Sequence, residues 1–309
     1  MRPIAEAYKD FPILHKEHNG HRVIYLDSGA TAQIPQSVID RVVEHMTQRN
    51  GNPHRGSHIL AIEASEDYEN ARDRVVEFIN AREREEVIFT RNSTESMNLI
   101  AHSYGLHNVK KGDKIVITVA EHHANLVTWQ YVAEQTGATL EYMYLDEHGH
   151  LKDGEINKID EKTKIVAFAH VSNVLGMEFP VKELTEKAHS VGAIVVLDGA
   201  QSTPHKKIDV QALDCDFFVF SGHKMCASQG IGVLYGKRDL LETMPPFLLG
   251  GDMIEYVKEQ TATFNELPYK FEAGTPNADG AVSLHAAIDY LESFGMDAIE
   301  AYEEELVAY

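Results

Sequence analysis

Short apolar runs alternate along the chain with stretches in which apolar residues recur every three or four positions. Recurrence at that spacing predicts amphipathic helices. Nearly continuous runs of Val, Ile and Phe are typical of strands buried on both faces of a sheet. We expect helices at 37–49, 60–78, 181–191, 279–293 and from 297 onward, and strands at 87–90, 114–119, 139–144, 164–170, 193–198, 217–221 and 232–235. The alternation predicts an α/β fold, a three-layer α/β/α arrangement with a mostly parallel central sheet.

The length of 309 residues predicts one large domain and part of a second, because single cores stop growing at roughly 250–300 residues. We expect an N-terminal segment over 1–24, a large domain over 25–285, and the start of an interdomain helix or small domain over 286–309. The last predicted helix still runs at Tyr309 without a stop signal, so we expect the chain to be cut short there. We expect 250–275 to be irregular, as an excursion from the large domain.

Charge and composition narrow the class of protein. The net charge is −20, from 28 Lys and Arg against 48 Asp and Glu, which repels nucleic acid and anionic membranes. The two cysteines, Cys215 and Cys226, are too few for a disulfide framework and fit a reducing cytoplasm. No apolar run reaches about 18 residues, and residues 1–10 lack the apolar core of a signal peptide. We therefore expect a cytoplasmic protein that crosses no membrane.

Polar and titratable residues follow five of the predicted strands. In open parallel sheets, ligands bind outside the carboxyl ends of the strands. We therefore expect these residues to share one edge and to form a site. They are 92–95, 121–123, 170–173, 198–201 and 221–224.

Lys224 and Asp198 carry the most specific chemistry of this set. Lysine amines form Schiff bases with carbonyl cofactors, and burial lowers their pKa for that work. A carboxylate that closes an apolar strand, as Asp198 does, needs a partner, because burial without one is costly. Lys224 as a surface ammonium and Asp198 as a helix cap or ion-pair partner are the alternatives. The functional interpretation is that Lys224 holds pyridoxal 5'-phosphate (PLP) while Asp198 pairs with its protonated ring nitrogen.

Ser93 and Thr94 precede a helical stretch, where hydroxyl residues are either ordinary caps or donors to a phosphate. With Lys224 and Asp198 expected at the same edge, we favour the phosphate. His123 follows another histidine, but no His-Glu-x-x-His motif or cysteine ligand at zinc spacing accompanies the pair. We therefore expect no metal, and expect the His123 ring to lie on the cofactor plane and to shuttle protons.

Six stretches of the chain resemble class V aminotransferase-fold enzymes, PLP-dependent proteins of fold type I. The resemblance is greatest to the SufS-type cysteine desulfurases and runs from about residue 25 to the end. The stretches follow the family's order and spacing, at 25–31, 54–56, 121–125, 198–201, 221–224 and 271–276.

The resemblance implies a role for each candidate residue. It gives Lys224 and His123 the catalytic positions, with Lys224 joined to PLP and His123 stacked on its ring. It implies a homodimer as well, because one residue of each subunit reaches the neighbour's cofactor. The remaining cofactor contacts are Asp198 to the ring nitrogen, Asn173 and Gln201 to the ring hydroxyl side, Ser93, Thr94, Ser221 and His223 to the phosphate, and Thr275 to the phosphate of the neighbouring subunit.

The activity that the resemblance implies is release of sulfur from L-cysteine, which leaves alanine. An enzyme cysteine takes the sulfur as a persulfide and passes it to a sulfur-acceptor protein for iron–sulfur cluster assembly. In the family that cysteine, and an arginine for the substrate carboxylate, lie in a C-terminal domain without a counterpart here. Neither Cys215 nor Cys226 occupies the family's position. We therefore expect this chain to bind PLP but to transfer sulfur poorly or not at all.

The loop after Lys224 also departs from the family. Members commonly have Tyr-Gly-Pro-Thr-Gly, whereas this chain has Cys-Ala-Ser-Gln-Gly over 226–230. Three alternatives stay open. They are a selenocysteine lyase acting on L-selenocysteine, an aminotransferase or epimerase of the same fold, and a catalytically silent PLP-binding partner. The sequence 123–125, His-Ala-Asn, favours the desulfurase.

Overall fold

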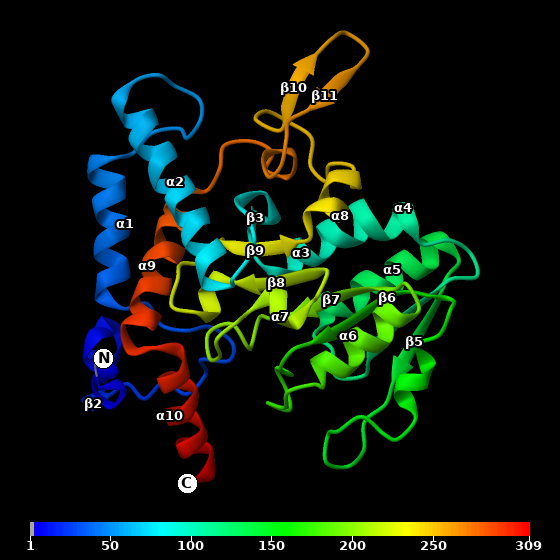
Figure 1. Ribbon diagram of the computed structural model, residues 1–309. Helices are drawn as coiled ribbons and strands as arrows, with labels where there is room; N and C mark the ends of the chain where they lie inside the picture. The colour runs from blue at the N-terminus through cyan, green and yellow to red at the C-terminus, as the bar shows by residue number, and fades with distance from the viewer. Residues whose placement is uncertain (1–2) are drawn as a thin grey trace.

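A computed structural model describes residues 3–309 as three layers, with a seven-stranded sheet between two layers of helices (Figure 1). The strand order is β3-β9-β8-β7-β6-β4-β5, and only β9 runs against the other six strands of this sheet. The strands are β3 (Val87–Thr90), β4 (Lys114–Thr118), β5 (Thr139–Met143), β6 (Thr163–Ala169), β7 (Ile194–Asp198), β8 (Phe217–Ser221) and β9 (Gly232–Gly236). The predicted fold class is confirmed, and each predicted strand ends within one residue of the observed bound.

Side chains that alternate along the strands fill two separate cores, as the period of two in a strand requires. Val195 and Leu197 of β7 join the core under α1, α2, α6 and α9, whereas Val196 joins the core under α3 and α5. Both faces of the sheet are therefore dry, which explains why the strands read as continuous apolar runs. The helices are α1 (Gln36–Gln48), α2 (Ile59–Phe78), α3 (Ser93–Leu99), α4 (Leu106–Asn108), α5 (Val127–Thr136), α6 (Val181–Ser190), α7 (Val210–Leu213), α8 (Arg238–Thr243), α9 (Ala278–Phe294) and α10 (Met296–Ala308).

One segment corrects the sequence analysis. We expected 250–275 to be irregular, but β10 (Ile254–Val257) and β11 (Ala262–Phe264) form an antiparallel hairpin that projects from the body (Figure 1). Most of its side chains are exposed, so the strands lack the apolar alternation by which strands are recognised. The predicted boundary between 285 and 286 stays a prediction and lies within α9.

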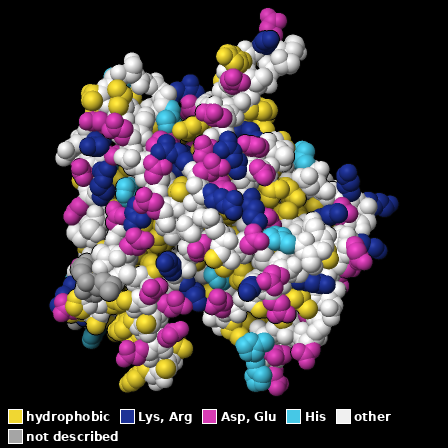
Figure 2. All heavy atoms as spheres, in the orientation of Figure 1, with side chains coloured by type: hydrophobic (Ala, Val, Ile, Leu, Met, Phe, Trp, Pro, Cys, Tyr) yellow, Lys and Arg dark blue, Asp and Glu magenta, His cyan; other side chains and the backbone are white. Residues whose placement is uncertain are grey.

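The N-terminal segment wraps one side of the body near α10 (Figure 1). It has short 3-10 turns at Ile4–Asp10 and Pro12–His15, and a small hairpin of β1 (Glu17–His18) and β2 (His21–Arg22). Residues 1–2 of the predicted segment 1–24 lie outside the described part. Over residues 3–309, no helix is long and apolar enough to cross a membrane. Figure 2 shows acidic and basic side chains interspersed over one face of the molecule.

Candidate active site

The carboxyl ends of β4, β6, β7 and β8 lie at one edge of the sheet, because these strands are parallel to one another. Asp198 is the last residue of β7 and Ser221 the last residue of the adjacent β8. Lys224 follows in a 3-10 turn, Gly222–Lys224, that begins directly after β8. The topology thus brings together stretches that are widely separated in the sequence.

The Asp198 carboxylate is almost fully buried, with 6% of the residue exposed. Its Oδ1 accepts a hydrogen bond from the Ala200 backbone N–H at 3.0 Å. Among the residues that the structure describes, no protein group donates to Oδ2. Burial raises the pKa of Asp198, while the Ala200 N–H and the positive charge of Lys224 lower it in part. The site therefore contains a costly buried carboxylate with one oxygen left for a ligand.

The Lys224 amine lies half-buried near this carboxylate. Burial lowers the pKa of Lys224, and the negative charge of Asp198 opposes that shift only in part. A lowered pKa increases the fraction of the neutral amine, which is the form that attacks a carbonyl carbon. The structure shows this amine half-buried just after a strand end and near a carboxylate, and its role as the cofactor lysine stays a prediction.

Ser93 and Ser221 meet where α3 begins beside the end of β8. Their hydroxyl oxygens lie 2.9 Å apart, and the Ser93 N–H donates to Ser221 Oγ at 2.9 Å. The residue that caps α3 is Asn92, whose side chain accepts from the Glu95 N–H. The Thr94 side chain is exposed at the same turn. Because Asn92 performs the capping, the hydroxyls of Ser93 and Thr94 are not needed for it.

His223 is held by the N-terminal stretch at 25–31, a contact that the sequence analysis missed. Thr31 Oγ1 lies 3.2 Å from His223 Nδ1 and donates to its carbonyl oxygen at 3.1 Å. Gln201 Nε2 donates to the Gly29 carbonyl oxygen at 3.0 Å. The one hint in the sequence was that 25–31 is among the six stretches that resemble the family. No local pattern indicates that this stretch contacts residues 201 and 223.

The turn after β4 contains Glu121, His122 and His123. Both histidines are exposed, and burial of part of the His122 ring lowers its pKa. The two ring centroids lie 6.1 Å apart. Over residues 3–309, no group of three or more potential ligands is placed to hold a metal ion.

Asn173 and Gln201 line the same cavity, of about 530 Å³, which α10 closes on its other side. Thr275, by contrast, is exposed on the loop before α9. Its loop lies against the loop after Lys224, because Asn277 Nδ2 donates to the Gly230 carbonyl oxygen at 2.7 Å. The structure therefore brings nine of the ten candidates to the carboxyl edge of the sheet, while Thr275 lies exposed on the loop before α9.

The loop after Lys224 has a definite shape despite its departure from the family sequence. Where the family has proline, the Ser228 N–H donates to Ser283 Oγ at 3.1 Å, and the two hydroxyls lie 2.7 Å apart. Cys226 adopts a left-handed conformation with φ 67°. Burial raises the pKa of the Cys226 thiol to about 12, and burial also raises the pKa of Cys215. Both cysteines are therefore protonated and poor nucleophiles at neutral pH.

Comparison with known proteins agrees with this geometry. The family model described as Aminotransferase class-V matches residues 24–309. The chain belongs to the class V aminotransferase family. A probable cysteine desulfurase of Halalkalibacterium halodurans is 53% identical over 98% of this chain and 75% of its own length. A probable cysteine desulfurase of Synechocystis is 50% identical over 99% of this chain and 73% of its own length.

A solved structure shows the same likeness. The apo cysteine desulfurase of Thermococcus onnurineus matches this class V chain with a TM-score of 0.93 and 41% identity, over 100% of this chain and 75% of that one. The chain therefore spans about three quarters of the length of its relatives.

Proposed function

We propose that this chain is the PLP-binding part of a cysteine desulfurase, which releases sulfur from L-cysteine and leaves alanine. The observation that supports it most directly is that the Lys224 amine and the Asp198 carboxylate lie near each other after adjacent strands, close enough for each charge to shift the other's pKa. Cysteine desulfurases at 50% and 53% identity support the choice of reaction. Those names give no support to a selenocysteine lyase, an aminotransferase or a silent protein.

The donor set fits PLP. Asp198 offers one unpaired carboxylate oxygen to a protonated ring nitrogen, and Lys224 offers an amine to the aldehyde. The phosphate end has the hydroxyls of Ser93, Thr94 and Ser221 beside the start of α3, with the His223 ring nearby. We assign Asn173 and Gln201, which line one cavity, to the ring hydroxyl side, as the family resemblance implies. Within residues 3–309, no charged group pairs with Asp198 Oδ2, so this oxygen stays available to a ligand.

When bound, PLP supplies an electron sink for negative charge that develops on the substrate carbon. The chain's own residues prepare that chemistry. Asp198 would hold a proton on the ring nitrogen, because a buried carboxylate stabilises a cation that it contacts. The Lys224 amine, whose pKa burial lowers, would accept and return the proton on the substrate carbon. His123, exposed at the same edge, donates a proton to the product or to the sulfur leaving group.

The sulfur step needs a thiolate nucleophile. Balanced, it converts L-cysteine and a thiol into alanine and a persulfide. Cys215 is fully buried, and the Cys226 thiol is protonated at neutral pH. We therefore propose that the isolated chain performs this step poorly or not at all. A homodimer, in which Thr275 reaches the neighbour's cofactor, and a sulfur-acceptor protein belong to the same proposal.

The test is the visible absorption spectrum of the purified protein after treatment with PLP. We expect the yellow band of lysine-bound PLP in the wild type, a shift of that band on adding L-cysteine, and no band in Lys224→Ala. Lys207→Ala, which removes an exposed lysine, is the matched control and keeps the band. A band that persists in Lys224→Ala, or is absent from the wild type, would contradict the proposal.

A further inference from the structure

A buried acid without an assigned role lies beside the proposed cofactor site. Glu121 follows β4 and is 8% exposed. Thr118 Oγ1 donates to its Oε1 at 2.5 Å, and Asn125 Nδ2 donates to its Oε2 at 2.6 Å. Asn125 Oδ1 in turn accepts from Trp129 Nε1 at 2.8 Å. The Ala169 backbone N–H, at the end of β6, is a further donor to the carboxyl.

These contacts connect three elements around one short turn. Thr118 ends β4, Ala169 ends β6, and Trp129 lies in the first turn of α5. The hydrogen bond between the Glu121 and Asn125 side chains closes this turn, and the histidines at 122 and 123 lie within it. Because both side chains of this closure are buried, the turn has one well-defined arrangement, and the exposed histidine rings inherit their position from it.

Buried carboxylates normally pair with a cationic side chain, and Glu121 has no such partner among the described residues. Among the residues that the structure describes, no Lys, Arg or His forms an ion pair with it. The charged group that faces it is Asp198 of β7, which is also a carboxylate. Burial raises the pKa of Glu121 to about 8, and the hydrogen bonds from Thr118 and Asn125 offset that rise only in part. The group is therefore a neutral carboxylic acid at neutral pH.

We infer that Glu121 is a positioning residue: as a neutral acid it fixes the turn that carries His122 and His123 at the cofactor edge, and it leaves the negative charge there to Asp198. This inference rests on the proposed function, since it assumes that Asp198 serves a cofactor ring nitrogen. We assign Glu121, which is buried, no contact with substrate or cofactor. Its ionisation above pH 8 adds a second negative charge beside Asp198, which gives the site an upper pH limit.

Two substitutions separate the effect of the charge on Glu121 from the effect of its hydrogen bonds. Glu121→Gln is a near-isosteric neutral side chain. Its amide oxygen accepts from Asn125, and its amide N–H donates to the Thr118 hydroxyl, which changes from donor to acceptor as it does towards a protonated carboxyl. Glu121→Leu keeps the volume but leaves the buried Asn125 amide without its acceptor. At pH 7 we expect Glu121→Gln to bind PLP with nearly wild-type affinity, and Glu121→Leu to bind it roughly 10-fold or more weakly. Above pH 8 the wild type loses affinity, whereas Glu121→Gln does not.

A second readout needs no cofactor. The folded pKa of Glu121 lies above its value in the unfolded chain, so the wild type loses stability as the pH rises from about 4.5 towards 8. The apo thermal midpoint of Glu121→Gln, measured from pH 5 to 9, should therefore fall less steeply over that window. Parallel midpoint profiles, or PLP binding at pH 7 as weak in Gln as in Leu, would overturn the inference. If Glu121→Leu does not fold, the Gln comparison decides alone. A wild type that never binds PLP sinks the proposed function instead, while the apo profiles still report the proton on Glu121.

Discussion

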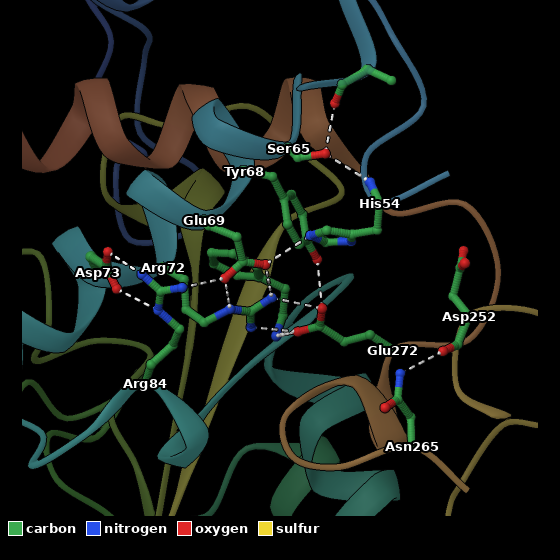
Figure 3. Close-up of polar contacts among 12 residues, drawn as sticks. His54, Ser65, Tyr68, Glu69, Arg72, Asp73, Arg84, Asp252, Asn265 and Glu272 are labelled. Atoms are coloured by element: carbon green, nitrogen blue, oxygen red, sulfur yellow. Dashed lines mark hydrogen bonds and ion pairs between the residues drawn. The ribbon is translucent and has the colours of Figure 1, made fainter. Parts of the chain in front are cut away.

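Two regions of this molecule bury carboxylates in opposite ways. Around Arg72, the side chains of Glu69 and Glu272 converge on one guanidinium that is 0% exposed (Figure 3). Glu272 accepts from Arg72 at 2.7 and 2.8 Å, from Tyr68 Oη at 2.8 Å and from the Phe89 N–H at 2.7 Å. At the carboxyl edge of the sheet, by contrast, Asp198 and Glu121 are buried near each other without a salt bridge among the described residues.

The pKa shifts record the difference. Burial raises the pKa of both Glu69 and Glu121, but at Glu69 the hydrogen bonds and positive charges of His54 and Arg72 outweigh burial and bring the pKa down to about 2. Glu121 has no such partners and its pKa rises to about 8. The paired cluster ties α2 to the loop before α9 and serves the fold. The unpaired edge costs stability, which is typical of sites arranged for a ligand.

The largest effect on stability should come from breaking the paired cluster. Glu272→Ala leaves the Arg72 guanidinium buried with fewer acceptors, so we expect a loss of about 3–5 kcal/mol in the free energy of unfolding. Urea denaturation measures it. Replacing both residues, as Arg72→Met with Glu272→Ala, should recover part of that loss, because no lone charge stays buried. Arg238→Ala, at an exposed ion pair with Glu242, is the control. An unfolding free energy of Glu272→Ala equal to that of the control would contradict the structural role.

A smaller effect is expected at the loop after Lys224, where hydrogen bonds carry no charge. Ser283→Ala removes the acceptor of the Ser228 N–H and the partner of its hydroxyl. Ser283 is fully buried, so we expect a loss of roughly 1–3 kcal/mol. Ser228→Pro removes the same N–H together with its need for an acceptor, and should restore stability in the Ser283→Ala background. If the stability losses of Ser283→Ala and Ser228→Pro simply add in the double variant, the Ser228 N–H is not the group that Ser283 stabilises.

The smallest effect, with the opposite sign, is expected at Asp198. Burial raises its pKa, so the folded state disfavours the ionised form, and stability is lost as the pH rises through the unfolded pKa. Asp198→Asn removes that titration. We expect the apo protein to gain about 0.5–2 kcal/mol at pH 7 while PLP binding weakens. Thermal unfolding and absorption titration measure the two changes. A variant that is destabilised while still binding PLP normally would place Asp198 with the structural carboxylates.

Much of the fold could be predicted because most of its strands are short, nearly continuous apolar runs. Six of the seven runs of the central sheet are buried on both faces and mostly apolar, and only β5, at the edge of the sheet, is largely part-exposed. The hairpin over 254–264 was missed because its side chains face solvent and carry no periodicity. At the site, Lys224, Asp198 and Ser93 could be found from their places at strand ends. The contacts of 25–31 with Gln201 and His223 could not, because they join residues about 170 to 190 positions apart.

The sequence by itself determined the class of fold, the strand-end lysine and aspartate, and the family-like stretches, since local periodicity and residue type carry that information. Only the tertiary structure decided which buried charges are paired. Glu272 and Glu121 are both single glutamates near apolar segments, and no local pattern distinguishes them. One faces the Arg72 guanidinium and the other faces Asp198. A charge takes its energy from the groups around it in space, and those groups come from distant parts of the chain.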